Sequence, residues 1–384
     1  MTAWDVIIVG AGPAGSALAC RLRPQHRVLL LEQLQAAARP GAAPRIGESL
    51  PGAARVLLQR LGLLDRFLAQ GHAERGAAVS QWDSDTPAWV DAVRDPQGAG
   101  WHLDRPRFDA GLREAAVAAG AQLRDSGRHL QVWHERGGWH IGLQGAGSSA
   151  RTHHAPVLVD ASGRRMVAAR QLGLARRAQD PLICLYVHLP ADPCDADQAT
   201  RICADTNGWW YSVRVPSGQR VLAFHLDRGD PELQALRDPA RLLAKAHRHD
   251  LLAGIRPAGA QVRVHAQPAG STGQEPDALA ALPEGFFAAG DAMLAFDPIA
   301  SQGLFNALAT ADGVAHAVAQ YAGGVTGARE RYLDDMRAVQ ARYVQRLRET
   351  YAAVARYAGQ PFWQRRTAAA MAPRPALTLA PVPG

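Results

Sequence analysis

The feature that most constrains this chain is a glycine-rich turn between two apolar runs near its start. Gly10, Gly12 and Gly15 follow the first apolar run and open a segment with helical spacing. A second apolar run over 28–31 ends at Glu32, a carboxylate that can accept hydrogen bonds from ribose hydroxyl groups. This order of strand, glycine turn, helix, strand and acid is typical of a unit that binds the ADP half of a dinucleotide.

Each residue of the turn has a physical reason to be there. Gly10 permits the tight turn, Gly12 lets a pyrophosphate approach the backbone, and Gly15 lets the helix pack closely on the strand. Pro13 and Ala14 begin the helix, whose free N–H groups can face the phosphates. The alternative is an ordinary glycine turn, and the motif does not identify the dinucleotide.

Length and composition indicate a globular protein with two domains, or with one large domain and an insertion. The chain has 384 residues, 47% of them hydrophobic, and a net charge of +7 in which Lys245 is the only lysine. Basic and aromatic residues do not alternate in any run, so we expect no nucleic-acid binding. Apolar stretches are too short for a membrane span, and the first one has no basic leader. We therefore expect a cytoplasmic protein.

Cysteines and histidines show no metal-binding pattern. The four cysteines form no C-x-x-C pair and are interpreted as reduced thiols. The 14 histidines have no metal-ligand spacing. We expect no metal, and we expect His153, His154, His247 and His249 to be exposed turn residues.

Nucleotide-binding signals and antiparallel strand signals alternate along the chain. This alternation predicts an α/β fold in which a doubly wound, Rossmann-like domain is interrupted by an antiparallel β-sheet substrate domain. The dinucleotide-binding domain is expected over 1–73, 100–175 and 266–320. The substrate domain is expected over 74–99 and 176–265, followed by a helical segment over 321–366 and a disordered tail over 367–384.

A second strand–loop–helix segment, GDAMLAFDPIASQG, runs from Gly290 to Gly303. Asp291 at the end of the strand can accept hydrogen bonds from a polyol, and Pro298 provides a rigid apolar edge. Gly303 and Leu304 open a helix whose N-terminus stabilises nearby negative charge. A reduced flavin, which is an anion at its pyrimidine end, needs such a dipole. The alternative is an ordinary loop with a helix cap.

Together these motifs resemble the FAD-dependent monooxygenase and halogenase superfamily, which includes p-hydroxybenzoate hydroxylase and the tryptophan halogenases. The resemblance covers about residues 1–365 and implies FAD as the cofactor. PFWQRR over 361–366 is similar to a branch whose flavoproteins modify side chains when quinone-cofactor oxidases mature. The further FAD contacts that the resemblance implies are Arg45 in RIGESLP, Arg105 in DRPRFD, and Asp160 and Gly163 in DASG.

Three departures from the halogenase pattern argue against halogenation. Halogenases have a catalytic lysine in the region of 74–82, where this chain has none, and Lys245 is expected in a distant surface helix. In the segment similar to their D-P-L-E-S-T-G, Ala300 replaces the glutamate and Gln302 the threonine. Their W-x-W-x-I-P signature is degenerate over 209–214.

The resemblance implies a monooxygenase that inserts one oxygen atom from O2 into an electron-rich, aromatic substrate through a flavin C4a-hydroperoxide. The substrate is either a small molecule or bound to a carrier or peptide. Without a second glycine motif for an NAD(P)H domain, electrons come from transiently bound NAD(P)H or from a reductase. No catalytic residue is assigned, because the cofactor supplies the chemistry.

Candidate substrate contacts lie on two neighbouring strand-like segments. Trp209 and Tyr211 share one face of a strand and Trp210 lies on the other, so one face could line a pocket beside the flavin. The alternative is a core of packed aromatic rings. The candidates are Gln81, Trp82, Trp209, Trp210 and Tyr211.

Three other functions stay open. The protein could be a flavin oxidase or reductase that inserts no oxygen, or a halogenase. It could also be an FAD-containing partner or maturation factor of another protein.

Overall fold

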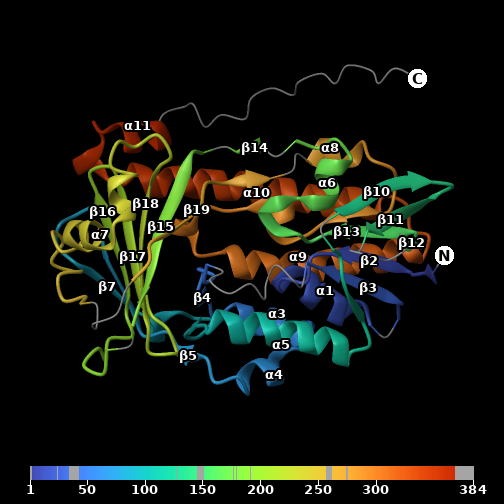
Figure 1. The fold of residues 1–384 in the computed structure, drawn as a ribbon, viewed down its shortest axis with the longest axis horizontal. Coiled ribbons are helices and arrows are strands. Elements are labelled where there is room, and N and C mark those ends of the chain that lie inside the picture. Colours follow the sequence, from blue (N-terminus) through green and yellow to red (C-terminus); the bar gives the residue numbers. More distant parts are fainter. Residues whose placement is uncertain are drawn as a thin grey trace.

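The chain forms two regions that lie side by side along its longest axis (Figure 1). One region is built on a parallel sheet and the other on a largely antiparallel sheet, which confirms the predicted fold class. The computed structural model describes residues 2–23, 25–33, 43–127, 129–144, 151–175, 177–178, 180–190, 192–256, 262–273 and 276–367.

A five-stranded parallel sheet forms the centre of the first region. Its order is β21 (Phe286–Ala288), β13 (Val157–Asp160), β2 (Val6–Val9), β3 (Val28–Glu32) and β9 (Gln122–Asp125). Strands β2 and β13 and most of β3 are buried, as their continuous apolar sequences require in a sheet covered on both faces. The carboxyl ends of these strands lie at one edge, where such folds bind ligands.

Three helices pack together against this sheet: α1 (Pro13–Leu22), α5 (Arg105–Ala118) and α9 (Gly303–Ala322). Helix α1 carries a run of small residues that is buried between α5 and α9, so the three helices can approach closely. Helix α5 begins where the Asp104 side chain accepts a hydrogen bond from the backbone N–H of Arg107. These helix starts lie on the same side as the carboxyl ends of the strands.

A four-stranded sheet packs against β2 and β13. Its order is β1 (Thr2–Ala3), β12 (Arg151–Ala155), β11 (Gly138–Gln144) and β10 (His129–Glu135). His153 and His154 lie in β12, so the expectation of exposed turn residues is wrong for them. His153 is buried in this strand, and its Nδ1 accepts a hydrogen bond from the Trp4 ring N–H.

The second region is a seven-stranded sheet whose two faces have different partners. Its order is β19 (His265–Pro268), β15 (Leu182–Leu189), β18 (Arg220–Asp227), β17 (Gly208–Arg214), β16 (Thr200–Asp205), β6 (Ala77–Gln81) and β7 (Ala88–Asp91). The inner face, which includes Cys184, Tyr186 and Trp209, joins the core of the first region. The outer face, which includes Trp210 and Phe224, packs under α7 (Pro239–Ala246).

Lys245 lies in α7 and is buried, which corrects the expectation of a surface position. Its ammonium group is 2.9 Å from a carboxylate oxygen of Glu232 and 3.5 Å from one of Asp205. A buried lysine needs such partners, and the sequence separation of these acids hides them from a helical pattern. His249 lies beside this cluster and contacts Asp205 at 3.0 Å, so it is not simply exposed either.

Two C-terminal helices follow α9. Helix α10 (Ala328–Ala352) extends along the molecule toward the second sheet, where α11 (Pro361–Thr367) covers one end of it (Figure 1). The Trp363 ring N–H donates to the backbone carbonyl of Asp205. The expected disordered tail lies outside the described residues from 368 onward, and Thr367 ends α11.

The remaining elements are short. Among the described ranges, no helix combines the length and apolar character that a bilayer crossing requires. Within the same ranges, histidines, cysteines and acids form no cluster suited to a metal ion. The short elements are α3 (Ala54–Arg60), α4 (Leu64–Leu68), α6 (Val167–Gln171), α8 (Pro276–Ala280), β4 (Ser49–Leu50), β5 (Ala73–Glu74), β8 (Trp101–His102), β14 (Arg177–Ala178), β20 (Thr272–Gly273) and β22 (Leu294–Ala295).

Candidate active site

A cavity of about 950 Å³ extends from the glycine turn to the inner face of the seven-stranded sheet. It lies at the carboxyl ends of the parallel strands, which is where doubly wound folds bind nucleotides. Both regions therefore contribute walls to one cavity. The predicted cofactor residues that line it are Gly10, Gly12, Pro13, Ala14, Glu32, Arg45, Arg105, Gly163, Gly290, Asp291, Pro298, Gly303 and Leu304.

Steric limits explain the glycines of the turn. A Cβ on Gly10 would lie 2.4 Å from the Ala161 carbonyl oxygen, and one on Gly15 would lie 1.9 Å from the Gly10 carbonyl oxygen. A Cβ on Gly12 would meet nothing within 4 Å. Gly15 thus serves helix packing behind the cavity, whereas Gly12 leaves space in front of the helix.

The start of α1 fits an anionic group. Helix α1 has no side-chain cap and no acidic residue in its first turn. Its first N–H groups therefore have no side-chain acceptor and face the space left by Gly12. An uncapped helix start beside an open glycine turn is what a pyrophosphate requires, so the residues present fit the phosphates of FAD.

Glu32 closes the same end of the cavity at the carboxyl end of β3. One carboxylate oxygen accepts the backbone N–H of Ala11 at 2.7 Å, and the other accepts that of Gln33 at 3.0 Å. These bonds orient the carboxylate, which still has lone pairs for two further donors. The arrangement suits ribose hydroxyl groups.

Two arginines lie where residues 43–49 form a wall of the cavity: Arg45 belongs to this segment, and Arg105 reaches it from α5. Arg105 is buried and donates to the carbonyl oxygens of Ile46 at 2.9 Å and Gly47 at 2.8 Å. Arg45 is half exposed and contacts Asp109 at 2.5 Å. Arg105 therefore holds the backbone turn in place, and Arg45 keeps donors available for a cofactor phosphate.

Asp160 is fully buried and does not line the cavity. Its carboxylate accepts hydrogen bonds from Ser162 and from the backbone N–H groups of Ala168 and Ala169, each of these two at 2.9 Å. It thereby caps α6 and fixes the turn after β13. Residues of that turn, including Gly163, line the cavity instead.

Asp291 faces the cavity next to a rigidly held arginine. Burial raises the pKa of the Asp291 carboxyl, and Arg164, whose Nε lies 3.5 Å from it, opposes that shift. The Arg164 guanidinium also donates to the carbonyl oxygens of Gly270 at 2.5 Å and Phe296 at 2.8 Å. The start of α9 has no side-chain cap and no acidic residue in its first turn, so it suits the negative charge of a reduced flavin.

Trp209 and Tyr211 form the aromatic wall of the cavity on the inner face of the sheet. The Trp209 ring stacks on that of His225, with centroids 3.6 Å apart and planes 8° from parallel. The Tyr211 hydroxyl lies 3.2 Å from the Ser49 hydroxyl. Burial lowers the pKa of His225 to about 3, so this ring is neutral at physiological pH.

The other three substrate candidates lie away from the cavity. Trp210 points to the outer face, where its ring N–H donates to Asp205 at 3.0 Å. Trp82 donates to the backbone carbonyl of Thr350 and packs behind Trp209. Gln81 donates to the backbone carbonyl of Asp85. The pleat of β17 and the packing of α10 on the sheet edge explain these positions.

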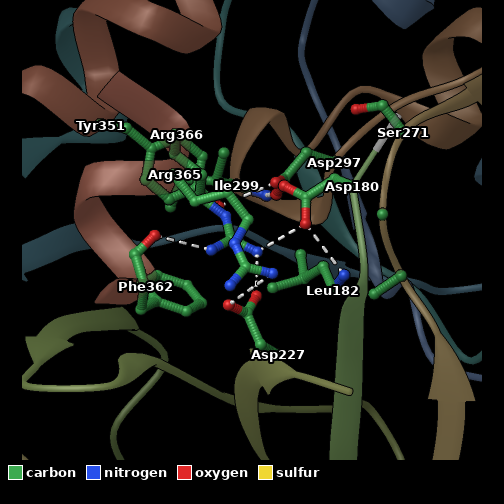
Figure 2. Close-up of polar contacts among 12 residues, drawn as sticks. Asp180, Leu182, Asp227, Ser271, Asp297, Ile299, Tyr351, Phe362, Arg365 and Arg366 are labelled. Atoms are coloured by element: carbon green, nitrogen blue, oxygen red, sulfur yellow. Dashed lines mark hydrogen bonds and ion pairs between the residues drawn. The ribbon is translucent and has the colours of Figure 1, made fainter. Parts of the chain in front are cut away.

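A buried polar network anchors the C-terminal helices beside the cavity (Figure 2). Arg366 of α11 contacts Asp180 at 2.6 Å and Asp227 at 2.7 Å, and its guanidinium lies 3.7 Å from the centre of the Phe362 ring. Asp180 lies two residues before β15, and Asp227 is the last residue of β18. Helix α11 is thus fastened to two strands of the sheet.

A second arm of the network reaches the cavity through Tyr351 of α10. The Tyr351 hydroxyl accepts the Trp209 ring N–H at 3.1 Å. It donates to Asp297 Oδ2 at 2.8 Å, and Figure 2 shows both of these residues. Burial raises the pKa of Asp297 to about 6. One hydroxyl group therefore links the aromatic wall to the loop before α9.

The cavity-lining residues that sequence reasoning missed include Glu48, Arg164 and His225. Glu48 lies three residues after Arg45 in the segment RIGESLP, so a charged residue within a recognised motif was the available signal. Arg164 follows DASG directly. His225 lies within the apolar strand sequence RVLAFHL, where an isolated polar residue was the signal.

Comparisons with known proteins agree with this geometry. The sequence pattern of the FAD binding domain family matches residues 3–223. LodB of Marinomonas mediterranea, which is named as an FAD-dependent oxidoreductase, is 27% identical over 378 residues, or 96% of this chain and 98% of that protein. The predicted resemblance to FAD-dependent monooxygenases and halogenases is thereby confirmed at the level of the superfamily.

Two solved structures share the fold over nearly the whole chain. The myxobacterial chondrochloren halogenase CndH has a TM-score of 0.78 at 22% identity, covering 96% of this chain and 86% of that one. The peptidyl tryptophan dihydroxylase QhpG has a TM-score of 0.74 at 22% identity, covering 99% of this chain and 81% of that one. Since the family pattern spans more than half of the sequence, the chain belongs to the FAD binding domain family and is an FAD-dependent oxidoreductase.

Proposed function

We propose that this protein is an FAD-dependent monooxygenase that inserts one oxygen atom from O2 into an electron-rich, aromatic substrate. The observation that carries the proposal is the continuity of the cavity. Its one end suits a dinucleotide, and its other end is an aromatic wall of Trp209, Tyr211 and His225. A flavin held between them would face an apolar, aromatic pocket.

The chain's own residues supply binding, orientation and exclusion of water. The starts of α1 and α9 favour the phosphates and the reduced flavin, and Glu32 suits the ribose. Arg164 positions Asp291 toward the cavity. When bound, FAD supplies the activation of O2. The buried aromatic wall keeps water from the reacting atoms.

The proposal extends to the partners. The sequence carries one glycine motif of the required context, so it offers no second motif for a separate NAD(P)H domain. Electrons therefore come from NAD(P)H that binds transiently or from a partner reductase. The substrate is a small aromatic molecule or an aromatic group on a peptide or carrier. The fold shared with QhpG, which is named for a peptidyl tryptophan substrate, supports the peptide-bound form. We place the protein in the cytoplasm on its unpaired cysteines.

The test is the mass of the product. The FAD-loaded protein is reduced without oxygen by NADH, NADPH or a reductase in the presence of candidate aromatic substrates, and O2 is then added. A product that has gained one oxygen atom supports the proposal. An unchanged or dehydrogenated product contradicts it and favours an oxidase or reductase. Tight binding of another protein without oxygen uptake would favour a maturation factor.

Halogenation is the second candidate because CndH shares the fold. Against it, the one lysine of the sequence is buried under the outer face of the sheet with Asp205 and Glu232. Lys245 therefore cannot carry a halogen species to a substrate in the cavity. Adding chloride or bromide to the same assay decides the matter, since a halogenase gives a product whose mass depends on the halide.

A further inference from the structure

Glu48 is a buried carboxylate without a partner. Only 2% of the residue is exposed, and neither carboxylate oxygen has a hydrogen-bond partner among the described residues. Glu48 nevertheless lines the cavity. Because an unpaired buried acceptor is costly, such groups in folded proteins are nearly always satisfied. The group that satisfies Glu48 has to enter from the cavity.

The backbone N–H groups of Gly47 and Glu48 favour the ionised Glu48 carboxylate but do not reach hydrogen-bond geometry with it. The side-chain donors around Glu48 are engaged elsewhere. The Arg105 guanidinium, whose charge acts on Glu48, donates to the carbonyl oxygens of Ile46 and Gly47. The Tyr186 hydroxyl donates to the carbonyl oxygen of Pro44 at 2.7 Å. Rearrangement of either donor toward Glu48 would break the hydrogen bond that it makes to the backbone.

The position of Glu48 indicates what it meets. Its charge acts on Cys184, Tyr186 and Tyr211, which all lie on the inner face of the seven-stranded sheet. The glycine turn and Glu32 belong to the other region. Glu48 therefore lies at the sheet end of the cavity, beside the aromatic wall rather than beside the nucleotide loops.

We propose that Glu48 accepts a hydrogen bond from an N–H or O–H group on the aromatic ring of the substrate. The site would thereby select phenols, indoles and anilines over analogues in which that hydrogen is replaced by an alkyl group. This inference rests on the proposed function for the aromatic character of the substrate. It adds the feature that the aromatic ring must carry.

The physical basis is the cost of leaving the carboxylate unpaired. A site built to bond a donor rejects an analogue that lacks it far more strongly than an apolar pocket rejects an extra methyl group. Burial raises the pKa of the Glu48 carboxyl to about 7 because it disfavours the ionised form. A bound hydrogen-bond donor acts in the opposite direction and favours the ionised form. A charged acceptor makes the stronger hydrogen bond.

The experiment measures binding, not turnover. The oxidised, FAD-loaded protein is titrated with indole, 1-methylindole, phenol and anisole, and binding is followed by the change in the flavin absorbance spectrum. We expect indole and phenol to bind at least tenfold more tightly than their methylated partners. In Glu48→Leu this preference should disappear, and Glu48→Gln should keep part of it through the amide oxygen. Glu114→Gln, which removes an exposed carboxylate on α5, should behave like the unmodified protein.

Several results would overturn the inference. One is equal binding of each methylated probe and its parent, and another is the absence of binding by all four probes. A third is a Glu48→Gln protein with altered FAD affinity but an intact preference, since Glu48 would then serve the flavin. If Glu48→Leu does not fold, the Gln variant alone decides. Normal probe selectivity without oxygen insertion would contradict the proposed function and leave this inference standing.

Discussion

The two ends of the cavity are built in different ways. At the nucleotide end the backbone makes the surface: Gly10 and Gly12 shape the turn, and Glu32 is held by the backbone N–H of Ala11. At the sheet end side chains make it, and Glu48 and the Nδ1 atom of His225 have no partner among the described residues. The first end meets requirements common to any bound dinucleotide. Under the proposed function, the second end would carry the chemistry that distinguishes this protein.

The largest effect is expected from Gly10→Ala, which tests the nucleotide end, where the backbone makes the surface. Gly10 has φ of 106°, and its added Cβ would lie 2.4 Å from a backbone oxygen. We expect a loss of about 4 kcal/mol or more, or no soluble protein, because the turn after β2 and the turn after β13 cannot both stay in place. Urea unfolding measures the loss. A stability within about 1 kcal/mol of the unmodified protein would show that this end adapts freely.

Gly12→Ala is the matched control. Its Cβ would meet nothing within 4 Å, and its φ of −74° suits any residue. We expect the free energy of unfolding without FAD to change by less than about 1 kcal/mol while FAD affinity falls at least tenfold. Unchanged FAD affinity would mean that the pyrophosphate does not approach the backbone at Gly12.

Arg366→Met tests the buried polar network that anchors α11 beside the sheet end of the cavity. Removal of the guanidinium leaves Asp180 buried without a cation and Asp227 with Arg365 alone, 3.5 Å away, which costs about 3–5 kcal/mol. Because neither acid lines the cavity, we expect the affinity for FAD to stay within twofold while the protein unfolds at lower urea concentration. Adding Asp180→Asn and Asp227→Asn should recover part of the loss. A triple variant as unstable as the single one would show that packing against Phe362, not charge, holds α11.

The nucleotide end could be predicted from the sequence because its constraints are local. The positions from Gly10 to Glu32 are set by a turn, one helix and two strands that follow one another. The alternation along β17 likewise placed Trp209 and Tyr211 on one face and Trp210 on the other. Which face meets the cavity depends on how the two regions pack, and no single segment of the sequence determines that packing.

Residues whose roles depend on distant partners could not be assigned. Asp160 was expected at the cofactor, but the N–H groups of Ala168 and Ala169 hold its carboxylate in the turn. Lys245 is buried because Glu232 and Asp205 approach it from other elements. Glu48 reaches the sheet only because residues 43–49 dock against β8 and α5. In each case long-range packing decides which group is engaged and which is left free.

Glu48→Gln should change how stability depends on pH. Burial raises the pKa of Glu48 from 4.5 to about 7. Between these values the folded protein keeps a proton that the unfolded chain has lost. The contribution is therefore fully present below pH 4.5 and is lost as pH rises through 7, by at most on the order of 3 kcal/mol.

The measurement is the free energy of unfolding from pH 5 to 8 for both proteins. We expect the curve of the variant to decline less, and the variant to gain stability relative to the unmodified protein as pH rises. Asp297, whose pKa is also raised by burial, titrates in both proteins and cancels in the difference. Parallel curves would show that Glu48 already has a partner in solution.

The smallest effect is expected from Tyr351→Phe, which probes the link between the two ends. The substitution keeps the ring contacts with Phe362 and Trp363 but removes the hydroxyl between Trp209 and Asp297. We expect a loss of about 1–2 kcal/mol, because two buried polar groups lose a partner. The pKa of Asp297 should rise further, since the lost hydrogen bond favoured its ionised form.

The functional consequence of Tyr351→Phe separates two views of the cavity. If the ends act independently, FAD affinity and the affinity for aromatic probes both stay within twofold. If the hydroxyl holds the aromatic wall in register with the loop before α9, probe affinity falls several-fold while FAD affinity does not, because Trp209 is free to turn. Tyr357→Phe is the control, since the Tyr357 hydroxyl has no hydrogen bond among the described residues and its ring stacks on the same Trp363. Because the sheet end of the cavity depends on groups from several elements, we expect probe affinity to fall while FAD affinity does not.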